Sequence, residues 1–145
     1  MVVQGILIGL ILFGPQGSPL FSSEPLTTIL QSCGIAIGLL ACIVMVIAAI
    51  NLGKNLTPLP HPKDDSVLIQ NGLYQYVRHP IYFGVLLAAL AWLLIFPGLY
   101  ILAYSICLFL LFDIKARREE VWLAQRFTSY KDYQARVKKL IPGIY

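Results

Sequence analysis

The chain has 145 residues, of which 58% are hydrophobic and only 12% are charged, whereas a soluble domain carries roughly 25% charged residues. So few polar side chains cannot cover a water-exposed globule, and the apolar residues come in long blocks. An ordinary soluble domain is therefore excluded, and a single integral membrane domain over residues 1–145 is predicted. The net charge is +4, and every Lys and Arg lies at or after Lys54. We interpret these residues as marking the cytoplasmic side of a membrane rather than a nucleic-acid-binding surface.

The first two apolar segments are predicted to be transmembrane helices. The first covers about residues 2–13 and is short against the roughly 17–25 residues that a spanning helix needs. Glycine and proline in the run Gly14-Pro15-Gln16-Gly17-Ser18-Pro19 end it. The second covers about residues 26–52 and contains no charged residue, which makes it the clearest span. A polar connection over residues 53–77 follows.

The third apolar block, about residues 81–112, is too long for one ordinary span. Pro97-Gly98 lies near its middle and predicts a tight helical hairpin of two spans, at about 80–96 and 99–116. From Lys115 onward, apolar and charged residues alternate in a pattern that predicts a C-terminal cytoplasmic amphipathic helix along or above the membrane surface. The predicted fold class is therefore all-α, an integral membrane bundle of about four transmembrane helices.

The distribution of positive charge orients this bundle. With four spans, the two outer connections are residues 14–25 and Pro97-Gly98, and neither contains Lys or Arg. The central connection and the C-terminal tail carry all of these residues, so the positive-inside rule places them, and both termini, in the cytoplasm. If the first block is only interfacial, the same face remains cytoplasmic.

Two polar clusters converge in this topology. Arg78-His79-Pro80 lies at the cytoplasmic entrance of the third span, and residues 115–120 lie at the exit of the fourth. Because a very short turn joins the two helices, their cytoplasmic ends should meet in one pocket. Each cluster also has a simpler interpretation, in which the basic residues are interfacial anchors and His79 caps a helix. Glu119 and Glu120 would then pair with Lys115, Arg117 or Arg118 on their own helix.

The residue order is more specific than either cluster. The segment Gly72-Leu73-Tyr74-Gln75-Tyr76-Val77-Arg78-His79-Pro80-Ile81-Tyr82-Phe83-Gly84 resembles the G-x-Y-x-x-x-R-H-P-x-Y-x-G signature of the isoprenylcysteine carboxyl methyltransferase family, which is itself similar to the phospholipid N-methyltransferases. Glu119-Glu120-Val121-Trp122-Leu123, followed by Phe127, Tyr130, Tyr133 and Pro142, is similar to the family's E-E-x-x-L-x-x-x-F…Y-x-x-Y…P ending. The resemblance covers about residues 55–142.

Some features depart from the family pattern. Phe127-Thr128-Ser129-Tyr130 is one residue shorter than the common F-G-x-x-Y. Ser66 stands where eukaryotic members often have His, and Lys138 replaces a common proline. The chain is also short, with fewer predicted spans than eukaryotic members. The methyl acceptor is therefore left open between an isoprenylcysteine carboxylate and a lipid.

The resemblance implies S-adenosylmethionine as cofactor and a cofactor region over about residues 55–82 and 115–142. The implied cofactor-binding residues are Ser66, Val67, Leu68, Ile69, Tyr74, His79, Pro80, Ile81, Tyr82, Glu119 and Glu120. Arg78, His79 and Glu119 are the implied catalytic residues, and Lys115 corresponds to a substrate-side position. The implied partners are the membrane and a lipophilic small molecule, lipid or lipidated substrate. No metal site is expected, because the three cysteines lie in apolar blocks and form no CxxC pair.

Two other functions remain open. Membrane sterol reductases have a similar R-H-P-x-Y and C-terminal tyrosine pattern and use NADPH, although they are generally longer. A non-catalytic membrane scaffold or interaction protein would use the same helices without a cofactor. Binding of S-adenosylmethionine, of NADPH or of neither by the purified protein distinguishes the three.

Overall fold

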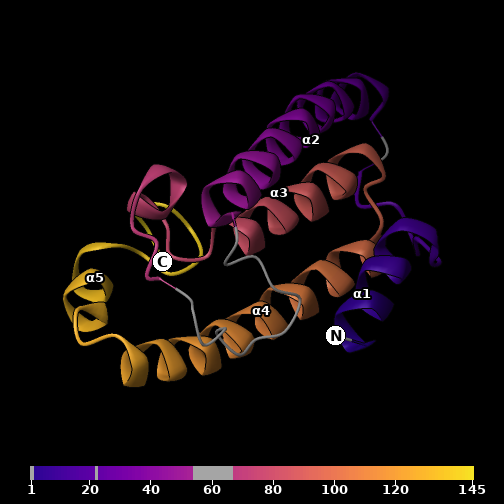
Figure 1. The fold of residues 1–145 in the computed structure, drawn as a ribbon. Helices are drawn as coiled ribbons and strands as arrows, with labels where there is room; N and C mark the ends of the chain where they lie inside the picture. Colours follow the sequence, from indigo (N-terminus) through magenta and orange to yellow (C-terminus); the bar gives the residue numbers. More distant parts are fainter. Residues whose placement is uncertain (1, 22, 54–66) are drawn as a thin grey trace. The chain divides into compact units, whose positions relative to one another are not determined.

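A computed structural model of the chain describes residues 2–21, 23–53 and 67–145. Its helices are α1 (Val2–Phe13), α2 (Glu24–Leu52), the 3₁₀ turn η2 (Gly72–Gln75), α3 (Pro80–Ile95), α4 (Leu99–Arg126) and α5 (Tyr130–Arg136) (Figure 1). Within these described ranges there is no strand, only two isolated bridges, so the all-α prediction is confirmed. Helices α2 and α4 are long and apolar enough to cross a membrane, whereas α1 and α3 are shorter apolar helices.

Helix α4 covers the predicted fourth span and continues beyond it. The sequence predicts a span to about residue 116 and a helix from Lys115 onward, and α4 runs through both without a break to Arg126. No glycine or proline interrupts residues 99–126, and Lys, Ala, Arg and Glu in its last third are strong helix formers. Glu119 and Glu120 therefore lie on the same rigid helix as the apolar residues before them. The membrane-surface location of the C-terminal part stays a prediction.

The chain forms two compact units, and α2, α3 and α4 contribute residues to both. The first unit consists of Met1–Ile43 and Gly84–Leu111, and the second of Val44–Phe83 and Phe112–Tyr145. Every predicted site residue that the structure describes belongs to the second unit.

In the first unit, α2 and α3 pack closely along a line of small residues (Figure 1). A Cβ atom on Gly34 would lie 2.8 Å from the carbonyl oxygen of Ala91 on α3, which is closer than real Cβ contacts. Gly38, one turn further along α2, faces the Cβ of the same alanine, and a Cβ added there would lie 3.6 Å from it. Such a pair of glycines four residues apart lets two helix backbones approach in an apolar solvent, where close packing rather than water drives helix association.

The two short connections of the first unit lie against each other. The backbone N–H of Leu20 donates to the carbonyl of Pro97 at 2.8 Å, and the N–H of Leu99 donates to Ser18 at 3.0 Å. Gly98 is required here, because a Cβ atom on it would lie 2.1 Å from the carbonyl oxygen of Gln16. The predicted Pro97-Gly98 turn between α3 and α4 is thus confirmed, and it packs on the α1–α2 connection.

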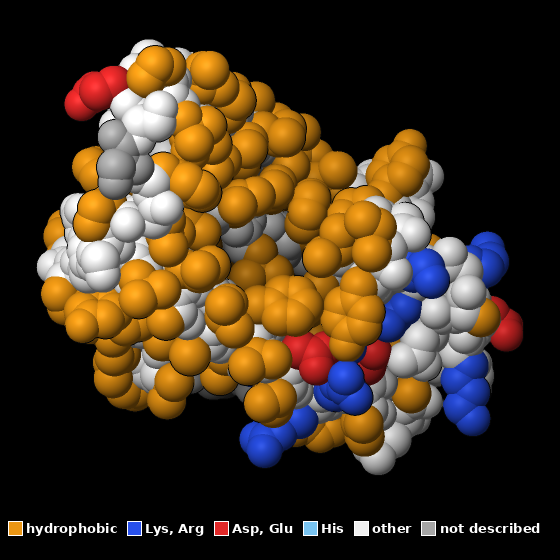
Figure 2. All heavy atoms as spheres, turned by 180° about the vertical axis from the view of Figure 1, so that it is seen from behind, with side chains coloured by type: hydrophobic (Ala, Val, Ile, Leu, Met, Phe, Trp, Pro, Cys, Tyr) orange, Lys and Arg blue, Asp and Glu red, His pale blue; other side chains and the backbone are white. Residues whose placement is uncertain are grey.

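The surface is apolar over a large area. On α2, Ile29, Leu39 and Ile50 are 61%, 65% and 70% exposed, and Figure 2 shows many hydrophobic side chains on the surface of the face that it draws. Among the described residues, every charged side chain except Glu24 belongs to the second unit. Exposed apolar side chains in such number are unfavourable in water and suit the hydrocarbon core of a bilayer.

Candidate active site

The segment that leads into α3 is held by a tight turn. Gly72 has a positive φ of 60°, and a Cβ atom there would lie 2.1 Å from the side-chain oxygen of Asn51. That oxygen instead accepts the backbone N–H of Leu73 at 2.9 Å. Pro80 is the first residue of α3, a position where the missing N–H costs no helical hydrogen bond. The turn and the proline together fix the two residues between them that carry the motif's polar side chains, Arg78 and His79.

The C-terminal segment lies parallel to this entrance (Figure 1). Val77 and Lys138 form an isolated parallel bridge. The backbone N–H of Arg78 donates to the carbonyl of Lys138 at 2.8 Å, and that of His79 donates to the carbonyl of Lys139 at 3.1 Å. The two residues directly before α3 are therefore held by the main chain of the tail.

Two buried tyrosines close this part of the unit. The hydroxyl of Tyr133 on α5 donates to the backbone carbonyl of Tyr74 in η2 at 2.5 Å. Burial raises the pKa of Tyr133 to about 12, and the nearby Arg78 guanidinium opposes this rise. Both phenols remain neutral, so they act here as packing and hydrogen-bonding groups.

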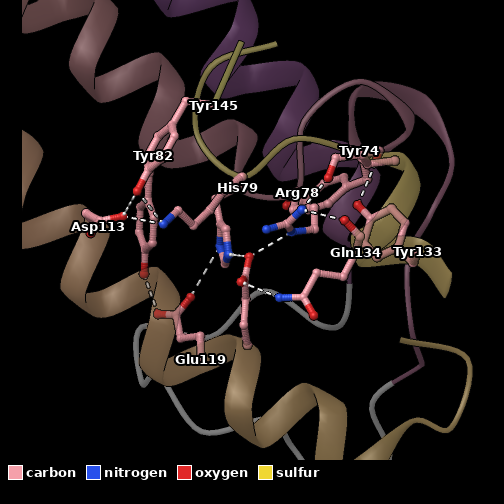
Figure 3. A network of polar contacts seen from close by, with 12 residues as sticks. Tyr74, Arg78, His79, Tyr82, Asp113, Glu119, Tyr133, Gln134 and Tyr145 are labelled. Carbon is pink, nitrogen blue, oxygen red and sulfur yellow. Dashed lines mark hydrogen bonds and ion pairs between the residues drawn. The ribbon is translucent and has the colours of Figure 1, made fainter. Parts of the chain in front are cut away.

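The imidazole of His79 lies between two carboxylates of α4 (Figure 3). Its Nε2 is 3.2 Å from Oε1 of Glu120, and its Nδ1 is 3.5 Å from Oε2 of Glu119. The polar groups at the start of α3 and at the end of α4 thus meet, as the sequence predicted. The glutamates contact His79 across the hairpin, so the simpler interpretation, in which they pair only along their own helix, is wrong.

Arg78 fixes the position of Glu120. Its Nε donates to Oε1 of Glu120 at 2.7 Å, and its guanidinium also donates to the backbone carbonyls of Gln134, at 3.1 Å, and Val137. The amide of Gln134 donates to the other oxygen of Glu120 at 3.0 Å. Burial would raise the pKa of Glu120, but hydrogen bonds from His79 and Arg78 outweigh it and lower the pKa to about 2. Glu120 lies beyond the apolar stretch 99–116 and is ionised at neutral pH.

Aromatic rings form the other side of the cluster. The ring of Tyr82 stacks on His79 with centroids 5.4 Å apart and on Phe112 with centroids 4.6 Å apart. The hydroxyl of Tyr82 donates to Glu119 (Figure 3). The ammonium of Lys115 lies 5.0 Å from the centroid of the Tyr82 ring and 5.8 Å from that of Phe112. The rings therefore present a face that already accepts a cation.

Comparison with known proteins assigns this arrangement to a family. The sequence model of the isoprenylcysteine carboxyl methyltransferase (ICMT) family matches residues 34–125, more than half of the chain. The chain belongs to this family. The matched range includes the start of α3 and both glutamates of α4.

The ICMT relatives are longer than this chain. A protein-S-isoprenylcysteine O-methyltransferase of Dictyostelium discoideum is 37% identical over 107 residues, which are 71% of this chain and 45% of that protein. One of Schizosaccharomyces pombe is 34% identical over 82 residues, 55% of this chain and 35% of its own. The chain thus spans less than half the length of these relatives.

Two further similarities bear on fold and function. A solved structure of a eukaryotic intramembrane Ras methyltransferase, an ICMT, matches with a TM-score of 0.73 at 25% identity, covering 99% of this chain and 50% of that one. A delta(14)-sterol reductase of Mus musculus is 31% identical over 140 residues, 79% of this chain and 32% of the reductase. The all-helical architecture is thus that of the ICMT membrane fold.

The structure describes most of the site residues that the ICMT motif implies. Tyr74 lies buried in η2, while Pro80, Ile81 and Tyr82 form the first turn of α3. Val67, Leu68 and Ile69 lie in a segment without regular secondary structure before η2, and Val67 is exposed. Ser66 lies outside the described residues. The binding and catalytic roles of all these residues stay predictions.

A second polar cluster was missed by the sequence reasoning. Asp113 on α4 binds the side chains of Arg117, Lys139 and Tyr145. One signal could have found it: Asp113 is the first charged residue of α4, after fourteen uncharged ones. An acidic residue inside an apolar helix has a partner as a rule, because an unpaired charge there is costly.

Proposed function

We propose that this protein transfers a methyl group from S-adenosylmethionine to a lipophilic acceptor at the cytoplasmic face of a membrane. The acceptor carries an isoprenylcysteine-like carboxylate or a lipid group. The observation that carries the proposal is the buried cluster in which Tyr82 and His79 hold the carboxylate of Glu119, in a chain of the ICMT family.

The two glutamates differ in what they have left to offer a ligand. Glu120 already accepts from Arg78, His79 and Gln134, and its side chain is 8% exposed. Glu119 has weaker and fewer charge partners, and its side chain is 17% exposed. We therefore assign the α-ammonium of the cofactor to Glu119, because a carboxylate–ammonium hydrogen bond is of the strong, charge-assisted kind. Glu120 acts through His79, whose ring it orients.

The aromatic face suits the sulfonium. The ammonium of Lys115 occupies the faces of Tyr82 and Phe112, so this surface favours a cation, and a sulfonium is attracted by the same ring quadrupole. When bound, the cofactor supplies an activated methyl group for an in-line displacement. An ionised carboxylate acceptor needs no general base, so the residues around it bind and align the two reactants and exclude water.

The surface and the charges support the location. A lipophilic acceptor would approach through the apolar surface of the helices, which is exposed over much of α2. The described Lys and Arg residues all belong to the unit that holds the cluster. The α1–α2 connection and the Pro97-Gly98 turn carry neither residue type and pack together. The four-span topology with both termini in the cytoplasm follows from the positive-inside rule.

Binding of the cofactor to the purified protein in nanodiscs tests the proposal. We expect saturable S-adenosylmethionine binding by calorimetry and methyl transfer from labelled cofactor to an isoprenylcysteine analogue or a lipid extract. Glu119→Gln keeps the size and the Tyr82 contact but removes the charge, so the Kd should rise about 10- to 100-fold. Lys131→Gln, on an exposed position of α5, serves as the matched charge-removing control and should bind like wild type. Absence of binding by the wild-type protein would refute the proposal.

A second function is favoured by one observation, the similarity to a sterol reductase over 79% of the chain. That protein's name describes a reductase, so the alternative is hydride transfer from NADPH to a sterol-like substrate. The same calorimetry with NADPH separates the two. NADPH binding without S-adenosylmethionine binding would establish the alternative, and binding of neither would favour a non-catalytic scaffold.

A further inference from the structure

The second polar cluster, made of Asp113, Arg117, Lys139 and Tyr145, has no role in the proposed chemistry. The ammonium of Lys139 donates to Oδ1 of Asp113 and, at 2.9 Å, to the hydroxyl of Tyr145. That hydroxyl donates in turn to the same Asp113 oxygen at 2.9 Å. The ammonium also lies 4.4 Å from the centroid of the Tyr145 ring. The side chains of Asp113, Lys139 and Tyr145 thus hydrogen-bond to one another, and Lys139 is only 9% exposed.

Arg117 is the outer member of the cluster. It donates to Oδ2 of Asp113 at 2.8 Å and to the Tyr145 hydroxyl at 3.2 Å, but its side chain is 65% exposed. An exposed ion pair of this kind contributes little, because water and salt screen it. The inner residues Asp113, Lys139 and Tyr145 are therefore the ones whose contacts are able to hold the main chain at Lys139 in place.

The main chain of Lys139 connects this inner set to the candidate active site. Its carbonyl accepts the backbone N–H of His79 at 3.1 Å. The imidazole of His79 then contacts Glu119 and Glu120, which follow Asp113 on α4 by six and seven residues. Since a helix rises about 1.5 Å per residue, α4 holds His79 at two points about 9 Å apart. At the first point the glutamates contact the imidazole directly. At the second, Asp113 binds the side chain of Lys139, whose carbonyl binds the backbone N–H of His79.

We propose that Asp113, Lys139 and Tyr145 form a positioning network that sets the location of the His79 imidazole between Glu119 and Glu120. The inference rests on the proposed function for its effect on the cofactor, but the placement of the imidazole itself does not depend on it. Tyr145 is the sharpest probe. Its hydroxyl links the other two side chains, so Tyr145→Phe removes both links while it keeps the ring.

The first measurement is made on the full chain in nanodiscs without any ligand. The chain has two histidines, His61 and His79, so two sets of imidazole NMR signals are assigned with His79→Ala. We expect Tyr145→Phe to shift the His79 signals at fixed pH. Tyr76→Phe removes the hydroxyl of a tyrosine that is 61% exposed, and this matched control should leave them unchanged. Unchanged His79 signals in Tyr145→Phe would overturn the inference, whatever the protein binds.

The second measurement is cofactor affinity. Tyr145→Phe should raise the Kd for S-adenosylmethionine about 3- to 10-fold, the range expected from loss of hydrogen bonds of ordinary strength. Lys139→Met should raise it further, and Lys139→Arg should restore part of the loss. In a His79→Ala background, Tyr145→Phe should not raise the Kd further, because the network acts through His79. The same rise in Kd in that background as in the wild type would overturn the inference. If the His79 signals shift but the wild-type protein binds no S-adenosylmethionine, the positioning network stands and the proposed function fails.

Discussion

Replacing Glu120 by alanine tests whether the buried polar cluster is held together as the contacts indicate. Glu120 accepts from Arg78 Nε at 2.7 Å, from His79 Nε2 at 3.2 Å and from Gln134 Nε2 at 3.0 Å. The side chains of Arg78 and Glu120 are only 9% and 8% exposed. Glu120→Ala leaves the guanidinium buried without a counter-charge. Removing one member of such a pair costs about 3–5 kcal/mol of unfolding free energy.

The assay is reversible unfolding in mixed detergent micelles, followed by circular dichroism as a denaturing detergent is added. The double variant Arg78→Met, Glu120→Leu removes both charges, and it should regain about 1–2 kcal/mol of the loss, because an apolar pair leaves no charge uncompensated. Lys131→Gln on exposed α5 should stay within about 0.5 kcal/mol of wild type. A loss below about 1 kcal/mol for Glu120→Ala, or a double variant as unstable as the two single changes added together, would refute the reasoning.

Acid stability, helix packing and cofactor affinity each offer a further test. The pKa of Glu120 is lowered from 4.5 to about 2, so its contribution to stability is present above pH 4.5 and is lost as the pH falls through about 2. The unfolding free energy of Glu120→Gln should therefore depend less on pH over that window than that of the wild type. Gly34→Ala would bring a Cβ atom to 2.8 Å from the Ala91 carbonyl oxygen and should cost about 1–3 kcal/mol in the same micelle assay, whereas Gly38→Ala, with 3.6 Å of clearance, should be nearly neutral. Tyr82→Phe keeps both ring stacks and loses only the hydroxyl bond to Glu119. Calorimetry should therefore give an S-adenosylmethionine Kd raised about 3- to 10-fold. An unchanged Kd would contradict the assignment of the cofactor's α-ammonium to Glu119.

The helices could be predicted because their signals are local. Long apolar runs separated by glycine and proline mark α1 to α4, and the Pro97-Gly98 turn alone explains why the start of α3 meets the end of α4. The predicted span ends at about residue 116, where the change from apolar to charged residues is expected to mark a change of solvent and not the end of the helix. Only the residues after Arg126 stop it.

The side-chain pairs inside the site could not be predicted from local sequence patterns. Helical spacing suggests partners three or four residues away, but Glu120 pairs with Arg78, which is 42 residues away. The Val77–Lys138 bridge is a single pair, so it has no strand-like alternation to reveal it. Asp113 and Lys139 are likewise 26 residues apart. Contacts of this kind depend on how the tail folds back, which tertiary packing decides.

The parallel bridge between Val77 and Lys138 also determines when the site can form during synthesis. Its two residues are 61 positions apart in the sequence. At roughly 5–20 residues per second, a ribosome needs about 3–12 s to add that many residues. During this interval α3 can enter the membrane while the main-chain acceptors of Arg78 and His79 do not yet exist. Insertion of the apolar helices and completion of the polar site are therefore separate events, and a chain interrupted before Lys138 would keep the first and lose the second.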